Sequence, residues 1–305
     1  MGSMRLVVLD LNALIGMQKP EQRVRLEPIL ADRSNLLMVT DQTFLEACGH
    51  GRECLEDILR PLVPYRDRVR AGRRHSELFQ IEAATRRPVT RQDLKATSDR
   101  TRNLQDALAA LESGQSGLQS FWDDAEVATE LQRRLSPEAT ASLIRDRVTS
   151  LQESIAEWSR REPPRAKGEW SLKRKMRHDV YDAGRVELCM KLAVGLTADH
   201  LIQDGVHWVV AKHLANVDSF SLRHELAYWL RCLHLIHDDR LGSWDRAGTA
   251  GKLVNEHFDI EYVAMASMAD LAACEDAASR DTLAMMELAL DLHFKRHGPV
   301  ARAVP

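Results

Sequence analysis

The sequence lacks three features that would assign it to a functional class at once: an excess of positive charge, a long apolar run and paired cysteines. Its formal net charge is −3, which argues against a protein that holds nucleic acid with its whole surface. Any phosphate binding must therefore come from local basic patches. No apolar stretch approaches the roughly 18 residues of a membrane-spanning helix, so we expect no membrane span.

The cysteines are few and scattered. Five occur in 305 residues and no two of them form a C-x-x-C pair, which is typical of unpaired thiols in a reducing compartment. The first residues also lack a basic region followed by an apolar segment and a small-residue cleavage site, which is the pattern of a secretory signal. We therefore expect a cytoplasmic protein.

Two short apolar runs near the N-terminus predict buried strands. Residues 6–9 and 36–40 are continuous and largely apolar, as expected of strands that are covered on both faces. Asp41 follows the second run and is placed to cap a helix that begins with QTFLEAC. Two buried strands, each followed by helical sequence, favour a parallel sheet with helical crossovers, which is an α/β fold.

The middle of the chain has a different pattern. Across residues 61–235 strand-like runs disappear, and apolar residues recur at helical spacing, as in Leu104, Leu108 and Leu111. This pattern predicts a large all-α insertion domain. The α/β core would then comprise residues 4–60 and 236–305, which together have the size of an ordinary domain.

Residues 236–305 return to a mixed pattern. We expect a helix beginning near Asp259, a short strand at residues 271–274 that ends in an acidic pair, and a terminal helix. Alanine is a poor strand former, but an apolar stretch ending in an acid repeats the arrangement at Asp10. That position supports assigning LAAC as a strand.

Four carboxylates could meet at one edge of this sheet. In an open parallel sheet, ligands bind outside the carboxyl ends of the strands, where Asp10 and Asp276 would point into the site. Glu46 lies in the helix after the second predicted strand, and Asp259 opens the helix before the last one. Their mutual repulsion is a cost that a divalent metal ion would relieve.

This ordered set resembles the PIN-like nuclease domains. The resemblance rests on a first strand that ends in Asp with Asn two positions later, on a Glu after the second strand, and on KLVNEHFDIEYVAMA. The last stretch is similar to the family's basic-x-x-Asn…Asp…Tyr helix, and a strand that ends in an acid follows it. The resemblance implies a three-layer core around a central parallel sheet. The matching residues are Asp10, Asn12, Glu46, Lys252, Asn255, Asp259, Tyr262 and Asp276.

The chain also departs from the family's pattern. Cys274 stands two residues before the last acid, where members often have Thr or Ser, and no closing strand is visible after the last helix. Glu275 could replace its neighbour Asp276 as the fourth acid. Glu256 competes with Asp259, because the two are one helical turn apart and could face the same ion.

The resemblance implies phosphodiester hydrolysis, most often of RNA, assisted by Mg²⁺ or Mn²⁺. Hard cations prefer oxygen ligands, which agrees with the residue types. Asp10 and Asp259 would be metal ligands, Glu46 and Asp276 would complete or orient the shell, and an endoribonuclease in a toxin-like or defence setting would fit. The residues assigned to catalysis and metal binding are Asp10, Glu46, Asp259 and Asp276, with Asn12, Lys252, Asn255 and Glu256 in support.

Two basic stretches in the helical segment could touch a nucleic-acid backbone. Residues 66–75 hold five arginines and one acid, and residues 165–178 hold six basic residues and one acid. Such a run can equally be a solvated face. The helical insertion would select or gate an RNA or DNA substrate, or hold a protein partner or inhibitor. The residues predicted to contact nucleic acid are Arg73, Arg74, Lys173, Arg174 and Lys175.

Other interpretations of the same residues stay open. Taken singly, Asp10 and Asp259 could each cap a helix, and only the coincidence of four acids favours a site. A second hypothesis is a binding module without catalysis whose helical insertion holds a protein partner. A third is a phosphatase of the haloacid dehalogenase type, although those enzymes usually have a second Asp where this chain has Asn12.

Overall fold

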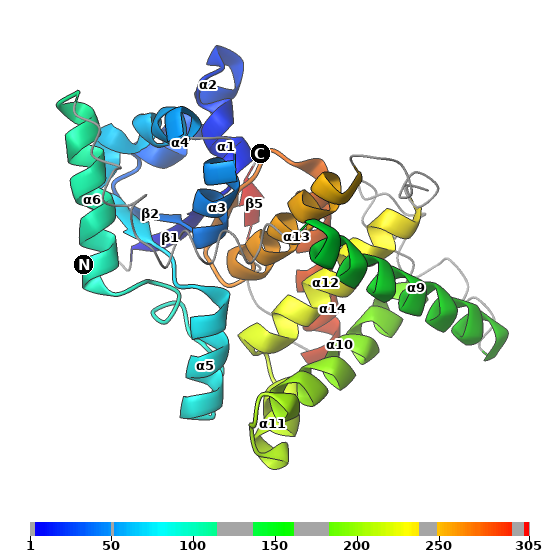
Figure 1. Ribbon diagram of the computed structural model, residues 1–305. Coiled ribbons are helices and arrows are strands. Elements are labelled where there is room, and N and C mark those ends of the chain that lie inside the picture. The colour runs from blue at the N-terminus through cyan, green and yellow to red at the C-terminus, as the bar shows by residue number, and fades with distance from the viewer. Residues whose placement is uncertain are drawn as a thin grey trace.

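A five-stranded parallel sheet forms the centre of the protein in a computed structural model (Figure 1), which describes residues 4–49, 52–114, 137–161, 183–237, 249–294 and 302–304. The strand order is β3-β2-β1-β4-β5, so the first strand lies in the middle, between the second strand and the fourth. The predicted α/β class with a parallel sheet is confirmed. The strands are β1 Arg5–Leu9, β2 Asn35–Val39, β3 Val69–Ala71, β4 Leu271–Ala273 and β5 Arg302–Val304.

Helices cover both faces of this sheet. Val7 and Leu9 of β1 pack into one apolar cluster with the helices on one face, whereas Leu6 and Val8 pack into a second cluster with the helices on the other face. Alternate side chains of a strand point to opposite faces, so a strand buried on both sides must be apolar throughout. This is why the continuous runs at residues 6–9 and 36–40 are strands.

The described ranges contain one 3₁₀ helix and twelve α-helices. None of these helices combines the length and the apolar character that crossing a membrane requires. Their bounds are α1 Leu11–Gly16, α2 Pro20–Ala31, α3 Asp41–Gly49, α4 Arg52–Leu59, η1 Arg60–Arg68, α5 His75–Thr85, α6 Ser98–Glu112, α9 Pro137–Arg161, α10 Ala183–Gln203, α11 Trp208–Ala215, α12 Phe220–His237, α13 Thr249–Ala266 and α14 Ala277–Phe294.

Three elements differ from the sequence prediction. The stretch 61–235 was expected to be all helical, but β3 lies within it and pairs with β2, since three residues are too few for a strand pattern to stand out. The helix expected to begin near Asp259 begins at Thr249, so that acid lies in its interior and is no cap. A closing strand, β5, does follow the last helix.

One helix of the middle segment, α12, is buried on all sides. It packs against α9, α10, α13 and α14, and Tyr228 and Trp229 on it are among the largest fully buried side chains (Figure 1). The helical segment therefore shares a core with the sheet. Apolar surroundings require that the charged groups of α12 have partners, because an unpaired buried charge costs several kcal/mol by order of magnitude.

The charges on the first half of α12 are all paired. Arg223 donates to the carboxylates of Asp218 and Glu287 and to the carbonyl of Ser267. Glu225 accepts from Arg147 and from Nδ1 of His200, at 2.9 Å for the latter. These contacts fix α12 against α9, α10, α13 and α14.

A single buried carboxylate holds the N-terminus of α12. Glu82 of α5 accepts the backbone N–H groups of Phe220 at 2.7 Å and Ser221 at 2.9 Å, the hydroxyl of Ser221 at 2.6 Å, and the N–H of Val89 at 2.9 Å. The first N–H groups of a helix have no partner within the helix, and a carboxylate is the acceptor that the helix dipole favours. Glu82 therefore sets where α12 begins.

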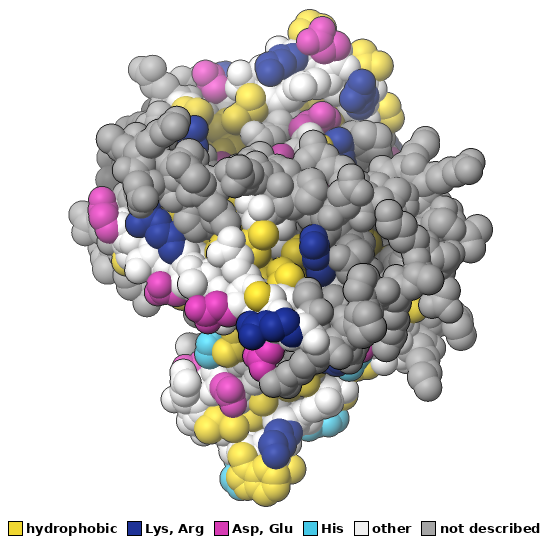
Figure 2. All heavy atoms as spheres, turned by 90° about the vertical axis from the view of Figure 1, so that its right-hand side faces the viewer, with side chains coloured by type: hydrophobic (Ala, Val, Ile, Leu, Met, Phe, Trp, Pro, Cys, Tyr) yellow, Lys and Arg dark blue, Asp and Glu magenta, His cyan; other side chains and the backbone are white. Residues whose placement is uncertain are grey.

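An exposed apolar patch lies at the far tip of the helical segment, over α11. Trp208 is 56% exposed and Val209 50% exposed, and Nζ of Lys212 lies 5.2 Å from the Trp208 ring centroid. Figure 2 shows the patch at the lower end of the molecule, and Figure 1 shows α11 far from the sheet. The patch is therefore separate from the strand ends described below.

We expect Glu82→Gln to lower the free energy of unfolding by about 2 to 4 kcal/mol, because one of four donors would then face an amide NH₂ group. Chemical denaturation monitored by tryptophan fluorescence measures this change. Glu153→Gln, an exposed substitution of the same kind on α9, should change the free energy by less than about 0.5 kcal/mol. Equal small effects in both variants would contradict this role of Glu82.

Candidate functional site

The ends of β1 and β4 bring two acids together from opposite ends of the chain. Leu9 is in register with Ala273, and the N–H of Asp10 donates to the carbonyl of Ala273 at 3.0 Å. Asp276 follows three residues after that carbonyl and is close enough for its charge to act on Asp10. The predicted juxtaposition of these two carboxylates at the carboxyl edge of the sheet is therefore present in the structure.

The other two predicted acids join them from helices. Glu46 on α3 lies close enough to Asp10 for the two charges to repel each other. Asp259 on α13 lies close enough to Asp10, Asp276 and Glu256 for their charges to raise its pKa. We call these five residues, Asp10, Glu46, Glu256, Asp259 and Asp276, the acid cluster.

A buried cation that the sequence analysis missed reaches into the acid cluster. Arg231 of α12 is 3% exposed, and its Nη2 donates to Glu256 at 2.6 Å and to Asp259 at 2.9 Å. Its Nε also donates to Glu256, and its Nη1 lies 3.5 Å from Asp276. One guanidinium group therefore binds three carboxylates from two elements. The available signal was a lone arginine inside an apolar stretch of helix, LAYWLRCLHLI.

The remaining two acids, Asp10 and Glu46, make no ion pair with any residue in the part of the chain that the structure describes. Asp10 is 4% exposed and accepts from Sγ of Cys274 at 3.4 Å and from the Asn12 side chain. Although Asp10 precedes α1, its carboxylate makes no side-chain capping bond to that helix. Helix capping therefore does not explain the buried carboxylate of Asp10. The Cys274 thiol donates to this carboxylate from the position where PIN-like domains often have Thr or Ser.

Burial raises the pKa of three of these acids. For Asp10 burial is the main cause, the charge of Asp276 adds to it, and the pKa reaches about 6. For Glu46 burial again dominates, Asp10 adds to it, and the pKa reaches about 7. Burial also raises the pKa of Asp259 well above its ordinary value, although Arg231 acts in the opposite direction. A carboxylate in this state gains most from a bound cation.

Asp276 differs from the other acids in its pKa. Burial works to raise this pKa, but Arg231 and the backbone N–H of Ser279, which donates to the carboxylate, together lower it. Asp276 therefore caps α14 while it binds the guanidinium group. Burial also raises the pKa of the Cys274 thiol, which keeps its proton available for Asp10.

The supporting residues from the resemblance fall into two groups. Lys252 and Asn255 are exposed on α13, whereas Glu256 is buried and binds Arg231. The hydroxyl of Tyr262 donates to the carbonyl of Ala273 at 3.1 Å, which fixes the end of β4 next to Asp10. Glu256 thus belongs to the acid cluster together with Asp259.

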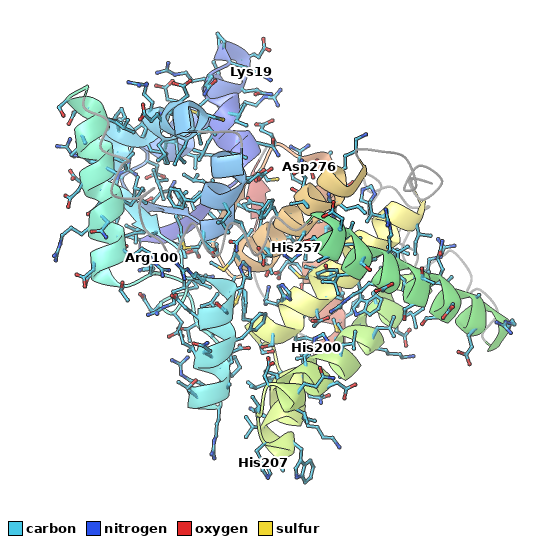
Figure 3. The ribbon with its side chains drawn as sticks, viewed as in Figure 1. Lys19, Arg100, His200, His207, His257 and Asp276 are labelled. Atoms are coloured by element: carbon cyan, nitrogen blue, oxygen red, sulfur yellow. The ribbon has the colours of Figure 1, made fainter. Side chains whose placement is uncertain are left out.

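A shallow, open depression borders the acid cluster. Glu275 lies on its wall, and Oε1 of that residue is buried without a hydrogen-bond partner among the described residues. Lys19, labelled in Figure 3, also lines the depression and supplies a positive charge. Both Glu275 and Asp276 line this depression, and Asp276 also binds Arg231. The lining residues are Asn12, Ile15, Lys19, Gln22, Glu275 and Asp276.

The basic stretch at residues 66–75 contributes mainly to the fold. Arg66 pairs with Glu112, Arg68 donates to the backbone carbonyls of three residues, and Arg70 donates to those of two others. Arg73 and Arg74, predicted to contact nucleic acid, are half-buried at the start of α5. The other three residues of that prediction, Lys173, Arg174 and Lys175, lie outside the described residues.

The residue types of the acid cluster fit a hard divalent cation. Carboxylate and amide oxygens surround Asp10, and two of the acids there have no positive partner. However, within the described ranges no group of three or more His, Cys, Asp or Glu side chains is placed to hold a metal ion. Three of the acids bind Arg231 instead, so the oxygens that fit a cation are those of Asp10 and Glu46 with Asn12.

No family model, curated protein or solved structure matches this chain. The resemblance to PIN-like domains therefore rests on the residues and their arrangement alone.

We expect Asp10→Asn to stabilise the protein in a metal chelator at about pH 8, by roughly 1 to 3 kcal/mol. The folded-state pKa of Asp10 is about 6, above the ordinary 3.8, so its ionised form opposes folding at high pH. The gain should shrink as the pH falls through about 6 and vanish near 4, where the carboxyl group is protonated in both states. Thermal unfolding across this pH range measures it.

Asp93→Asn is the matched control. Hydrogen bonds from Arg87 and Thr90 lower the pKa of Asp93, so the same substitution there should destabilise the protein at about pH 8. A destabilised Asp10→Asn protein under these conditions would mean that the Asp10 carboxylate already has a cationic partner.

Proposed function

We propose that the protein is a metal-dependent nuclease of the PIN-like type that acts on RNA, as the family resemblance implies, with Mg²⁺ or Mn²⁺ as cofactor. The observation that supports it is the convergence of Asp10, Glu46, Asp259 and Asp276, from both ends of the chain, at the carboxyl edge of a parallel sheet. Open α/β sheets bind their ligands at this edge.

Asp10 and Glu46, with Asn12, would hold the ion. A bound Mg²⁺ or Mn²⁺ supplies an acidified water and neutralises charge on phosphate oxygens. The chain's own contribution is to keep Asp10 oriented through Cys274 and Asn12, and to keep Arg231 among the other acids. Lys19, which lines the same depression as Asp276, would contact a phosphate of the substrate.

The alternative of a binding module without catalysis has one observation in its favour. Arg231 neutralises three carboxylates of the acid cluster, so part of the site is satisfied without a metal ion. In that case the protein would bind RNA or a partner protein but bind no Mn²⁺. Calorimetric titration with Mn²⁺ distinguishes the two functions.

We expect the purified protein to cleave RNA when Mn²⁺ or Mg²⁺ is present and to lose this activity in a chelator. Asp10→Asn should lower the cleavage rate at least about a hundredfold, because a carboxylate that binds the ion is lost. The cleavage rate is measured on a fluorescently labelled RNA. The same measurement on a labelled DNA of matching sequence gives the preference for RNA over DNA.

Asp106→Asn, which removes an exposed acid from α6, should cleave at the rate of the unchanged protein. Equal rates for Asp10→Asn and Asp106→Asn would refute the assignment and point to a contaminating nuclease.

Lys19→Ala should weaken RNA binding about three- to tenfold and lower the salt dependence of binding by about one counterion. Binding is measured in the Asp10→Asn background, so that the RNA stays intact, at several salt concentrations. Lys191→Ala removes a lysine that pairs with Glu187 on α10 and should leave the salt dependence unchanged. An unchanged slope for Lys19→Ala would place the RNA elsewhere.

A further inference from the structure

The position of Arg231 divides the acid cluster into two parts. Glu256, Asp259 and Asp276 all bind its guanidinium group, whereas Asp10 and Glu46 have no cation among the described residues. Each of these three carboxylates already gives one oxygen atom to the guanidinium group, and a divalent ion placed among them would be repelled by that positive charge at close range. A divalent ion and Arg231 therefore exclude each other in that part.

Arg231 is also held in place by the helix that carries it. Glu82 binds the N-terminus of α12, and Arg223 and Glu225 on its first half are paired with carboxylates, an arginine and a histidine of the surrounding helices. The Arg231 side chain is 3% exposed, and its ion pairs with three carboxylates hold it there. It is a fixed charge in the acid cluster.

We propose that the Arg231 guanidinium occupies the position of a divalent cation among Glu256, Asp259 and Asp276 and so limits the site to one divalent ion, bound from the side of Asp10 and Glu46. This inference rests on the proposed metal-dependent function and specifies it further. Arg231 acts through the acids and is a positioning residue. Removing its side chain exposes three converging carboxylates and creates a second cation site.

The same helix offers a matched control, Arg223. It lies eight residues before Arg231, is equally buried, and also binds two carboxylates. Its partners include the carbonyl of Ser267, which precedes β4, so it lies toward the amino edge of the sheet. Removing Arg223 should damage the fold without opening a site at the acid cluster.

The experiment titrates the full chain with Mn²⁺ and counts bound ions by electron paramagnetic resonance. We expect one ion for the unchanged protein, two for Arg231→Met and one for Arg223→Met. Both variants should melt at least about 5 °C lower in a chelator. Millimolar Mn²⁺ should restore most of this loss in Arg231→Met and little in Arg223→Met, because three carboxylates converge on Arg231 and two on Arg223.

A second comparison does not depend on the folding of Arg231→Met. In the unchanged background, Glu46→Gln should weaken Mn²⁺ binding at least tenfold, and Glu256→Gln less than about threefold, because Glu256 belongs to the part that Arg231 fills. Equal losses in the two variants, or a single ion in a folded Arg231→Met protein, would overturn the inference while leaving the nuclease function intact. No Mn²⁺ binding by the unchanged protein would overturn both.

Discussion

The ion pairs of Arg231 with three carboxylates connect α12 to α13 and to the segment between β4 and α14. A guanidinium group that is taken out of water is tolerated only when its hydrogen-bond donors are satisfied by anions, and the anions in turn need the cation. Arg231 lies on α12, and its three partners follow it by 25 to 45 residues, on α13 and directly before α14. This mutual dependence fixes the depth at which α12 lies and the rotation of α13 about its own axis.

The rest of the architecture supports this contact. Successive side chains of β1 point alternately into two apolar clusters, so the helices on both faces pack tightly against the same sheet. At the carboxyl edge the strands end, and polar side chains there lie outside the apolar clusters. A cluster of acids at this edge has a free-energy cost in repulsion, which the buried positions of Asp10 and Glu46 increase. Proteins retain such arrangements mainly where they serve a function.

Much of the core could be predicted from the sequence, because the relevant signals are local. The apolar runs of β1 and β2 and the acids that end β1 and follow β4 lie in short contiguous stretches. Arg231 escaped prediction because its role depends on partners 25 to 45 residues away, although an arginine flanked by buried residues already demanded an anion. β3 and β5 are three residues long, so neither had a pattern to detect.

The order of the strands in the sheet has a consequence for biosynthesis. β1 is made first, yet one of its two neighbours is β4, which begins 262 residues after β1 ends. Until the ribosome has released that segment, one edge of β1 stays open and Asp10 has neither the Ala273 carbonyl nor Cys274 beside it. Contacts at such separation slow folding and leave sheet edges exposed to other chains. A growing polypeptide therefore carries no assembled acid cluster. The cluster can perform its chemistry only after β4 has been synthesised.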